Sequence, residues 1–370
     1  MNENVKAFLS SSKIVPQIIK NSIAKKTNYY DYKKGLEPLE IWENDFSTSI
    51  PIYQVYHHVH SFMDDCKIEN GVAISNNGKI RKVLFLGYDG MRADAAAQVV
   101  SVKNAYNLNE IGAGVKYGGI ANVANEGGLY LAYCGGETGK ETQQSTSTSA
   151  GWTAQFTGVW GIKNGIKENC DTKNMRFKTF ALEYAEKGLS TSINFDWTPF
   201  FNDNLKPEII YAANHPQYKI KYINTSLKSA NPNSAVEKYT LAGETGKTIE
   251  DTAARDCTLN RISKGDSIVC GIYDTIDASG HKFEFSPDNT EYMKAITVCD
   301  FYTYQILQEI KKREKELNEE WLVILANDHG GKGRGHGGQS LDERTTWIAT
   351  NIKMNTKMFS KNYNGKTENN

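Results

Sequence analysis

The sequence predicts an α/β fold, a three-layer α/β/α sandwich around a mostly parallel central sheet. Two observations carry this prediction: short, almost wholly apolar runs recur along the chain, each ending at an aspartate, and helical stretches lie between them. Strands that are apolar on both sides are typical of parallel sheets covered by helices on both faces. Ligands bind beyond the carboxyl ends of such strands, so the aspartates are expected to share one edge.

Three segments have the pattern of buried parallel strands. The first is KVLFLGYDG (82–90), the second is SIVCGIYDTID (267–277), and the third is WLVILANDHGG (321–331). Each is a short apolar run that opens into a polar or glycine-containing stretch at its aspartate.

Helical stretches separate these strands. In SAGWTAQFTGVWG (149–161), Trp152 and Phe156 are spaced as on one helix face. MRFKTFALEYAEKGL (175–189) is amphipathic and ends at a glycine, and residues 289–317 form a long pattern with a charged end. These spacings and stop signals predict helices that cover the sheet.

The domain organisation follows from changes in composition along the chain. Residues 1–80 mix helical and extended signals and are expected to form an N-terminal extension packed on the main domain, which spans 81–370. The segment of about 195–250 is rich in aromatic residues, Asn and Pro, and we expect a cap or insertion there that selects the substrate. The aromatics of FDWTPFFND (195–203) could stack on a base or pack under this cap.

Composition limits the partners of the chain. Lys plus Arg and Asp plus Glu both total 43 in 370 residues, so no global charge favours a nucleic-acid duplex or an anionic membrane. No apolar run approaches a membrane span, and the first residues lack a secretory signal, which predicts a soluble, cytoplasmic protein. The six cysteines are scattered without a C-x-x-C motif, so free thiols are expected, with Cys270 and Cys299 buried. The oligomeric state stays open.

Carboxylates and imidazoles cluster on the predicted strand edge. Divalent metals need such ligands to converge from different segments. A single strand-end aspartate is more often a helix cap or a turn former, but six candidates together favour metal, enough for two ions with three ligands each. In DASGH (277–281) the glycine is expected to let the chain turn toward one ion. The candidates include three of the chain's seven histidines and are Asp89, Asp277, His281, Asp328, His329 and His336.

A hydroxyl-rich loop offers a nucleophile. QQSTSTSAGWTAQFTG (143–158) runs into a predicted helix, whose first turn presents unpaired N–H groups that would stabilise a phosphate. A Ser or Thr at this junction could attack phosphorus once a metal lowers its pKa. The alternative is that these residues are helix N-caps, which would suit Ser149 equally well.

Five short motifs together resemble the alkaline phosphatase superfamily, and most closely its type I phosphodiesterase/nucleotide pyrophosphatase branch. Each motif is weak alone, but their order over residues 82–350 is specific, and the resemblance does not cover the first 80 residues. It implies an alkaline phosphatase-like catalytic domain. The motifs are YDGMRAD (88–94), STSTSAGWTAQFTG (145–158), DASGH (277–281), NDHGG (327–331) and GHGG (335–338).

The resemblance also implies roles for individual residues. One metal would be held by Asp277, His281 and His336, and the other by Asp89, Asp328 and His329 together with the nucleophile. The family's nucleophile lies nine residues before a Thr-Gly pair, which here implies Thr148, with Ser147 and Ser149 as the near alternatives.

The function implied is that of a two-metal phosphoesterase. The enzyme would be a phosphodiesterase or nucleotide pyrophosphatase, acting through a metal-activated Thr148 and a phospho-threonine intermediate. Two divalent ions, Zn²⁺ with Mn²⁺ as the alternative, would clamp the attacking and leaving oxygens. A small phosphate ester or nucleotide-like molecule would be the substrate.

The chain departs from the branch after the nucleophile. The branch usually has Phe-Pro-Asn there, whereas this chain has Ser149-Ala150-Gly151, so the Asn donor to phosphate is missing. Backbone N–H groups or another side chain are expected to replace it, with Ser149 and Gly151 as candidates. Lys332 and Arg334 are further candidates for a phosphate contact. The small residues resemble the phosphatase branch and leave monoester or diester preference open.

Alternatives remain at this point. An alkaline-type phosphomonoesterase could use the same site, and a catalytically silent relative could bind metal and phosphate only.

HHVH (57–60) could offer two histidines to a metal from one strand face, but no third ligand lies nearby, so packing is favoured. We expect Arg92 to brace the metal-site loop through a salt bridge rather than to bind substrate.

Overall fold

The structure is a computed structural model of the chain. Residues 1–48, most of the expected N-terminal extension, lie outside the part that it describes. The described residues are 49–100, 106–108, 113–115, 118–171, 175–226, 236–238 and 250–355.

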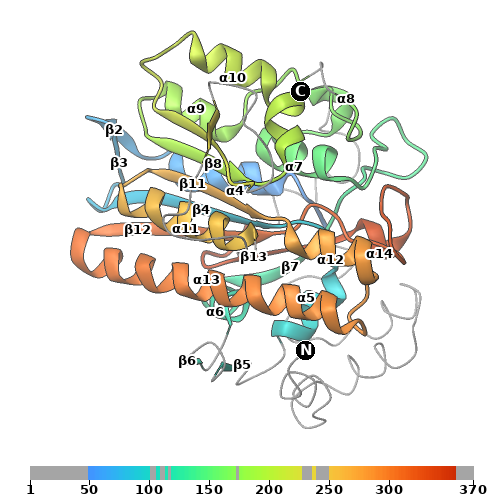
Figure 1. The fold of residues 1–370 in the computed structure, drawn as a ribbon. Helices are drawn as coiled ribbons and strands as arrows, with labels where there is room; N and C mark the ends of the chain where they lie inside the picture. Colours follow the sequence, from blue (N-terminus) through green and yellow to red (C-terminus); the bar gives the residue numbers. More distant parts are fainter. Residues whose placement is uncertain are drawn as a thin grey trace.

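A mostly parallel sheet forms the centre of the molecule and confirms the predicted α/β fold (Figure 1). Within the described residues the sheet has 11 strands, and β13 alone runs antiparallel to its two neighbours in the main path. The hairpin of β2 (Lys67–Glu69) and β3 (Val72–Ile74) extends the start of β4. The main path runs in the order β1 (Ile50–Pro51), β7 (Gly128–Tyr133), β13 (Thr345–Thr350), β12 (Glu319–Ala326), β4 (Ile80–Tyr88), β11 (Ile268–Tyr273), β8 (Thr191–Phe195), β9 (Ile220–Asn224) and β10 (Val236–Lys238).

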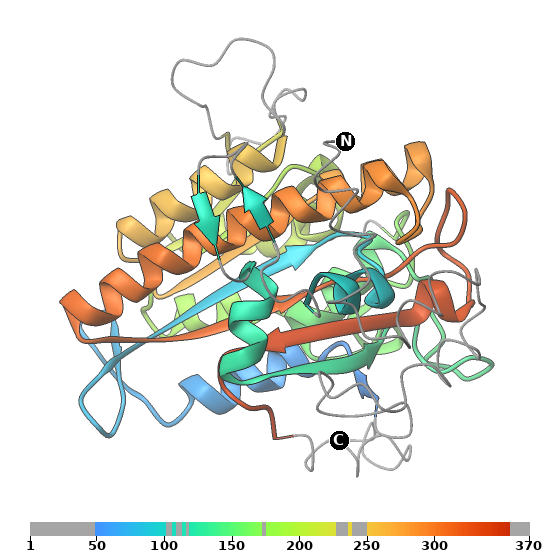
Figure 2. The same ribbon diagram turned by 90° about the horizontal axis from the view of Figure 1, so that it is seen from below.

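Helices cover both faces of the sheet and complete the three layers. Figure 2 shows the long helix α13 (Thr290–Leu317) running along one face. This face also carries α5 (Ala93–Val100), α6 (Gly119–Glu126), α11 (Glu250–Ser263) and α12 (Thr275–Phe283). The other face carries α4 (Gln54–Met63), α7 (Thr148–Thr157), α9 (Phe180–Glu186), η1 (Phe200–Asn204) and α10 (Lys206–Ala213). The short helices α8 (Gly161–Asn164) and α14 (Leu341–Arg344) follow α7 and precede β13, and β5 (Tyr106–Leu108) pairs with β6 (Ala113–Val115) in a separate ribbon.

The central strand β4 shows why its sequence is a continuous apolar run. Successive side chains on a strand point to opposite faces. Leu84 and Leu86 therefore join the core under α13, whereas Val83 and Phe85 join the core under α7. All four are fully buried. Both faces of β4 need apolar residues because both are covered by helices.

Local signals set the helix boundaries. The helix expected within 149–161 is α7, which ends at Gly158 in the left-handed conformation with φ of 75°. The side chains of Thr179 and Asn289 accept hydrogen bonds from the first turns of α9 and α13.

The described part of segment 195–250 continues the sandwich. Residues 206–213 form the helix α10, and β9 pairs in parallel with β8. Phe195, Phe200 and Phe201 are fully buried in the core, so these rings pack inside the protein rather than offering a surface to a base. Residues 227–235 and 239–249 lie outside the described part.

The thiols agree with the expectation from composition. All six cysteines are free, and Cys270 and Cys299 are buried. Among the described residues, none of the helices combines the length and the hydrophobicity that a membrane crossing requires.

A buried carboxylate ties α10 to its neighbours far from the carboxyl edge of β4. Glu208 accepts hydrogen bonds from the backbone N–H and hydroxyl of Thr179 and from the hydroxyl of Tyr222. Burial outweighs these bonds and raises the pKa of Glu208 from 4.5 to about 7.

This raised pKa predicts a pH dependence of stability. The folded state holds the Glu208 proton more tightly than the unfolded chain does, so the contribution is fully present below pH 4.5 and is lost as the pH rises through about 7. One pKa unit corresponds to about 1.4 kcal/mol, so the loss amounts to about 3 kcal/mol.

Urea unfolding of wild-type protein and Glu208→Gln between pH 4 and pH 8 would measure it. In Glu208→Gln the free energy of unfolding should no longer fall with pH in this range. The altered hydrogen bond to Thr179 lowers the stability of the variant by the same amount at every pH and so does not affect the slope. Glu186→Gln, at a partly exposed carboxylate of α9, is the control and should keep the wild-type slope. Equal slopes in all three proteins would contradict the prediction.

Candidate functional site

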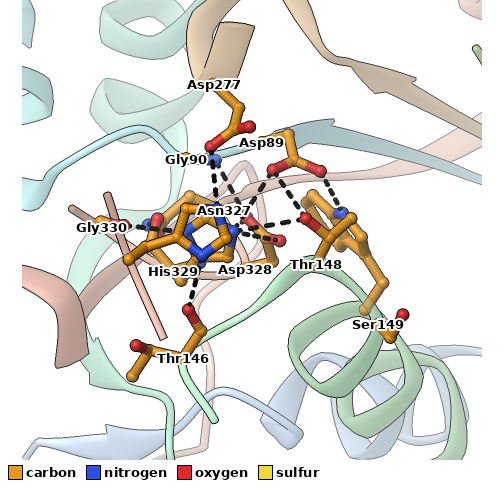
Figure 3. Close-up of polar contacts among 12 residues, drawn as sticks. Asp89, Gly90, Thr146, Thr148, Ser149, Asp277, Asn327, Asp328, His329 and Gly330 are labelled. Atoms are coloured by element: carbon orange, nitrogen blue, oxygen red, sulfur yellow. Dashed lines mark hydrogen bonds and ion pairs between the residues drawn. The ribbon is translucent and has the colours of Figure 1, made fainter. Parts of the chain in front are cut away.

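The first ligand group lies where two neighbouring strands end. Asp89 follows β4, and Asp328 and His329 follow β12, which pairs with β4 in parallel. All three side chains are fully buried. One ligand atom from each lies within 4.8 Å of the others, so the structure brings this predicted trio together (Figure 3).

The second group lies beside the first and nearer to solvent. It consists of Asp277 and His281 on α12 and His336 in the stretch between β12 and α14, with ligand atoms again within 4.8 Å. The rings of His329 and His336 stack with centroids 3.9 Å apart and join the two groups. The side chain of His281 is 46% exposed and that of His329 is 0% exposed, so the second group reaches solvent at His281, whereas the first is enclosed.

The predicted turn in DASGH is wrong. Residues 275–283 form α12, which places Asp277 in its first turn and His281 one turn later on the same face. Gly280 allows close packing rather than a turn, because a Cβ there would lie 2.3 Å from the ring of Phe285. The four-residue spacing of a helix therefore brings the two ligands together.

Hydrogen bonds fix the orientation of all three histidines. The Nδ1 atoms of His329, His281 and His336 lie 2.7, 3.0 and 3.0 Å from the backbone oxygens of Gly330, Arg334 and Thr146. A carbonyl can only accept, so each Nδ1 donates, and each Nε2 faces the carboxylates. Histidine ligands of metals in proteins usually have such a partner on the other ring nitrogen.

Burial disfavours the charged form of two of the carboxyl groups. Burial and the charges of Asp328 and Asp277 raise the pKa of Asp89 well above its ordinary value, and burial likewise raises that of Asp328. Oδ1 of Asp328 accepts the N–H groups of Gly90 and His329, but its Oδ2 and Oδ1 of Asp277 are buried without a hydrogen-bond partner. Such oxygens are suited to a cation.

The pKa values of His329 and His281 shift in opposite directions because their environments differ. Burial lowers the pKa of His329 to about 3, so this ring is neutral. The hydrogen bond and charge of Asp277 raise the pKa of His281 to about 9. A neutral ring is the form that binds a metal, so the buried His329 already has the required protonation state.

Thr148 is the hydroxyl residue that reaches the first group. It is the first residue of α7, and its Oγ1 lies 3.5 Å from Oδ1 of Asp89 and 3.5 Å from Nε2 of His329. Asp89 Oδ1 and His329 Nε2 are also 3.5 Å apart, so the three atoms form a nearly equilateral triangle. Donors bound to one Zn²⁺ at about 2.0–2.1 Å are separated by about 3.4 Å in a tetrahedron, so the residues fit this ion.

The two substrate contacts expected on α7 instead hold the helix in place. The Ser149 hydroxyl is buried and donates to Asn204 in η1, and its N–H donates to the side chain of Asn169. The N–H of Gly151 donates to Ser147, and a Cβ at Gly151 would lie 2.7 Å from Cβ of Asp328. Gly151 therefore permits α7 to approach the metal-ligand strand closely.

Lys332 and Arg334 lie in an exposed tight turn. Lys332 and Gly335 exchange two backbone hydrogen bonds, and both basic side chains are exposed. The backbone oxygen of Arg334, rather than its guanidinium, contacts the site through His281.

Arg92 braces the site as expected. Its guanidinium binds Asp94 and Asp342 and donates to the backbone oxygens of Phe285 and Gly331. It therefore joins the segment after β4 to the segments that follow His281 and His329.

Sequence reasoning missed two residues that hold the ligands. The indole N–H of Trp152 donates to Oδ2 of Asp89 at 2.9 Å. The hydroxyl of Thr146 donates to the oxygen of Gly338 and accepts the N–H of Gly337, while its backbone oxygen accepts from His336. In the sequence, Trp152 had the signature of a core residue and Thr146 that of an ordinary loop hydroxyl.

The histidines of HHVH do not join the site. Residues 54–63 form the helix α4 rather than a strand. His58 contacts the hydroxyl of Thr350, and burial lowers its pKa to about 4, whereas His60 lies between Asp64 and Glu183. Both histidines serve packing between elements, as favoured from the sequence.

Comparison with known proteins adds similarities of fold. No family model and no curated protein matches the chain. Alkaline phosphatase from the Antarctic bacterium TAB5 is 15% identical, with a TM-score of 0.40 over 76% of this chain and 96% of that one. Phosphonoacetate hydrolase from Sinorhizobium meliloti is 11% identical, with a TM-score of 0.45 over 71% of this chain and 60% of that one. Murine ectonucleotide pyrophosphatase/phosphodiesterase 5 in complex with AMP is 14% identical, with a TM-score of 0.39 over 68% and 57%. Similarities of this degree carry no argument about ligands or activity.

The contacts of Thr146 predict a cost of removing its hydroxyl. In Thr146→Val the N–H of Gly337 loses its acceptor, and we expect the free energy of unfolding to fall by about 1–3 kcal/mol. Thr297→Val is the matched control, because the Thr297 hydroxyl donates only to Met293 one turn earlier in its own helix. Thermal or urea unfolding measures both, and an equal effect of the two substitutions would contradict the special role of Thr146.

Proposed function

We propose that the chain is a two-metal phosphoesterase of the alkaline phosphatase superfamily that prefers phosphodiesters. The observation that carries this proposal is the position of the Thr148 hydroxyl. It lies at the amino end of α7, within 3.5 Å of a carboxylate and an imidazole, beside a second group of three ligands. The order of the five sequence motifs supports the same reading.

The proposed ligands divide into the two groups described. Asp89, Asp328 and His329 would hold one ion with Thr148, and the group of Asp277, His281 and His336 would hold the other. When bound, the ions would neutralise the carboxylates, lower the pKa of the Thr148 hydroxyl and stabilise the leaving oxygen. Zn²⁺ suits this set of carboxylate and imidazole donors, with Mn²⁺ as the alternative.

Residues of the chain position the phosphoryl group and provide the oxygen that forms the new bond to phosphorus. The Thr148 hydroxyl gives up its proton to solvent and its oxygen forms the bond to phosphorus, while the alcohol leaves with the electrons of the broken P–O bond and takes up a proton from solvent. Water then displaces Thr148 from phosphorus in a second step, which releases the phosphomonoester that remains of the diester and restores the hydroxyl. The amino end of α7 favours negative charge on the phosphoryl oxygens, and the close fit of Gly151 against Asp328 fixes this helix end relative to the ligands.

Charge in the site supports a diester over a monoester. With two divalent ions bound, the three carboxylates would leave one positive charge, and none once Thr148 is ionised, so the site offers no surplus of positive charge to a doubly charged monoester. Within the described residues, the structure assigns no hydrogen bond or ion pair between a Lys or Arg side chain and Thr148, Asp89 or His329. Arg92 is occupied by Asp94 and Asp342. A monoester dianion would lack the additional cation.

The position of the second group supports a substrate with a sizeable leaving group. His281, on the open side of the site, is 46% exposed at its side chain. If this group stabilises the leaving oxygen, the alcohol departs on the side of the exposed His281. A nucleotide-like alcohol is therefore compatible with the site.

Hydrolysis of two chromogenic esters tests the proposal. With Zn²⁺ or Mn²⁺ present, we expect faster cleavage of bis(p-nitrophenyl) phosphate than of p-nitrophenyl phosphate. Thr148→Ala should lower kcat/KM for the diester by at least about a thousandfold, because the nucleophile is lost. Ser149→Ala is the matched control at the adjacent hydroxyl, which already donates to Asn204, and should lower it less than about tenfold.

The outcomes separate the candidate functions. Preference for the monoester would identify the alternative phosphomonoesterase. Cleavage of neither ester, with Thr148→Ala retaining phosphate binding, would leave a silent metal- and phosphate-binding protein. Loss of activity in Ser149→Ala but not in Thr148→Ala would identify Ser149, rather than Thr148, as the nucleophile.

Ion content provides a test that is independent of turnover. We expect the wild-type chain to bind two Zn²⁺ ions and His336→Ala to retain one, because His336 belongs to the outer group alone. Elemental analysis after dialysis and calorimetric titration would count the ions. His215→Ala, at a partly exposed histidine just after the end of α10, should retain two. Loss of both ions in His336→Ala would contradict separate ligand groups.

A further inference from the structure

We propose that Trp152 is a positioning residue that restricts Asp89 to binding its metal through a single oxygen. The inference rests on the proposed function, since it concerns the ion held by Asp89. The indole N–H of Trp152 donates to Oδ2 of Asp89 at 2.9 Å. The other oxygen, Oδ1, is the one that lies 3.5 Å from both Thr148 and His329.

The two oxygens of Asp89 therefore have separate partners (Figure 3). A hydrogen bond from an N–H to a carboxylate is stronger than one between neutral groups, and both partners here are fully buried. Asp328 shows the same division, because its Oδ1 accepts two backbone N–H groups and its Oδ2 has no hydrogen-bond partner. Each carboxylate of the inner group thus offers one oxygen to an ion.

The indole is locked in place by the strand beneath it. A Cβ on Gly87 of β4 would lie 2.5 Å from the Trp152 ring, so the ring fills the space that a side chain would need. The ring also meets Phe85 edge to face at 5.9 Å between centroids. Trp152 consequently cannot turn away from Asp89 without displacing the core.

The same helix carries the donor and the nucleophile. Trp152 lies four residues after Thr148 on α7, which is about one helical turn. Any shift of α7 would move the Thr148 hydroxyl and the indole N–H together. Because Asp89 is prevented from occupying two positions around the ion, one position stays available to Thr148.

Zinc affinity in a one-ion background tests this role. In His336→Ala, which is expected to keep the inner ion, the added change Trp152→Phe should weaken Zn²⁺ binding by about 10–100-fold, as loss of a hydrogen-bond partner of a ligand typically does. Competition with a chromophoric chelator measures the affinity without substrate. Trp321→Phe is the matched control, because its buried indole donates to Glu319 at 2.8 Å at the opposite end of β12. The control should leave the affinity unchanged.

The wild-type protein provides a measurement that does not depend on how well Trp152→Phe folds. In proton–nitrogen NMR, the indole signal that moves in Asp89→Asn, stays in place in Glu319→Gln and persists in Trp347→Phe belongs to Trp152. The third condition is needed because the indole of Trp347 donates to the backbone oxygen of Met91, near Asp89. We expect this signal to shift when Zn²⁺ fills the inner group, because the Oδ2 that it contacts belongs to a ligand of that ion.

Each result decides the inference. Weaker Zn²⁺ binding in Trp152→Phe alone, with the NMR shift, supports it. Three results overturn it while the two-metal proposal stands. They are an unchanged Zn²⁺ affinity in Trp152→Phe, an equal loss of affinity in Trp321→Phe, and an indole signal that does not shift when Zn²⁺ binds. A wild-type chain that binds no Zn²⁺ at Asp89 overturns both proposals.

Discussion

The burial of carboxyl groups at the carboxyl edge of the sheet is the constraint on which the surrounding structure depends. Asp89, Asp277 and Asp328 converge there, and burial raises the pKa of Asp89 and Asp328 well above its ordinary value. The chain opposes this cost with hydrogen bonds to one oxygen of each buried carboxylate, from an indole and from backbone N–H groups. The other oxygens of these two carboxylates, Oδ1 of Asp89 and Oδ2 of Asp328, lie beside His329, so the unfavourable burial and the capacity to bind a cation have the same origin.

The ligands stand on rigid elements, and loops are tied to those elements by side chains. Parallel pairing of β4 with β12 sets the distance between Asp89 and Asp328. The less regular segments carrying His336 and following α12 are held by Thr146 and by the buried guanidinium of Arg92. Ligands fixed in this way need little rearrangement on binding, which favours affinity and catalysis.

The sequence predicts the parts of the site that follow from local rules. Asp89 and Asp328 could be placed because aspartates after apolar parallel strands share one edge. The turn predicted in DASGH is wrong because a glycine is compatible with a turn and with a helix, and the close approach of Phe285 that requires Gly280 lies outside the motif. Trp152 and Thr146 could not be assigned, because their partners lie 63 and 191 residues away and no periodic pattern links them.

The unequal burial of the two ligand groups gives the site an inside and an outside. His329 is 0% exposed at its side chain and His281 is 46% exposed, so solvent and chelators reach the outer group more easily than the inner one. If ions bind as proposed, they would exchange on different timescales, the outer one quickly and the inner one slowly. The inner group would then act as a durable structural anchor, while the outer group adjusts its occupancy to the metals present in the surroundings.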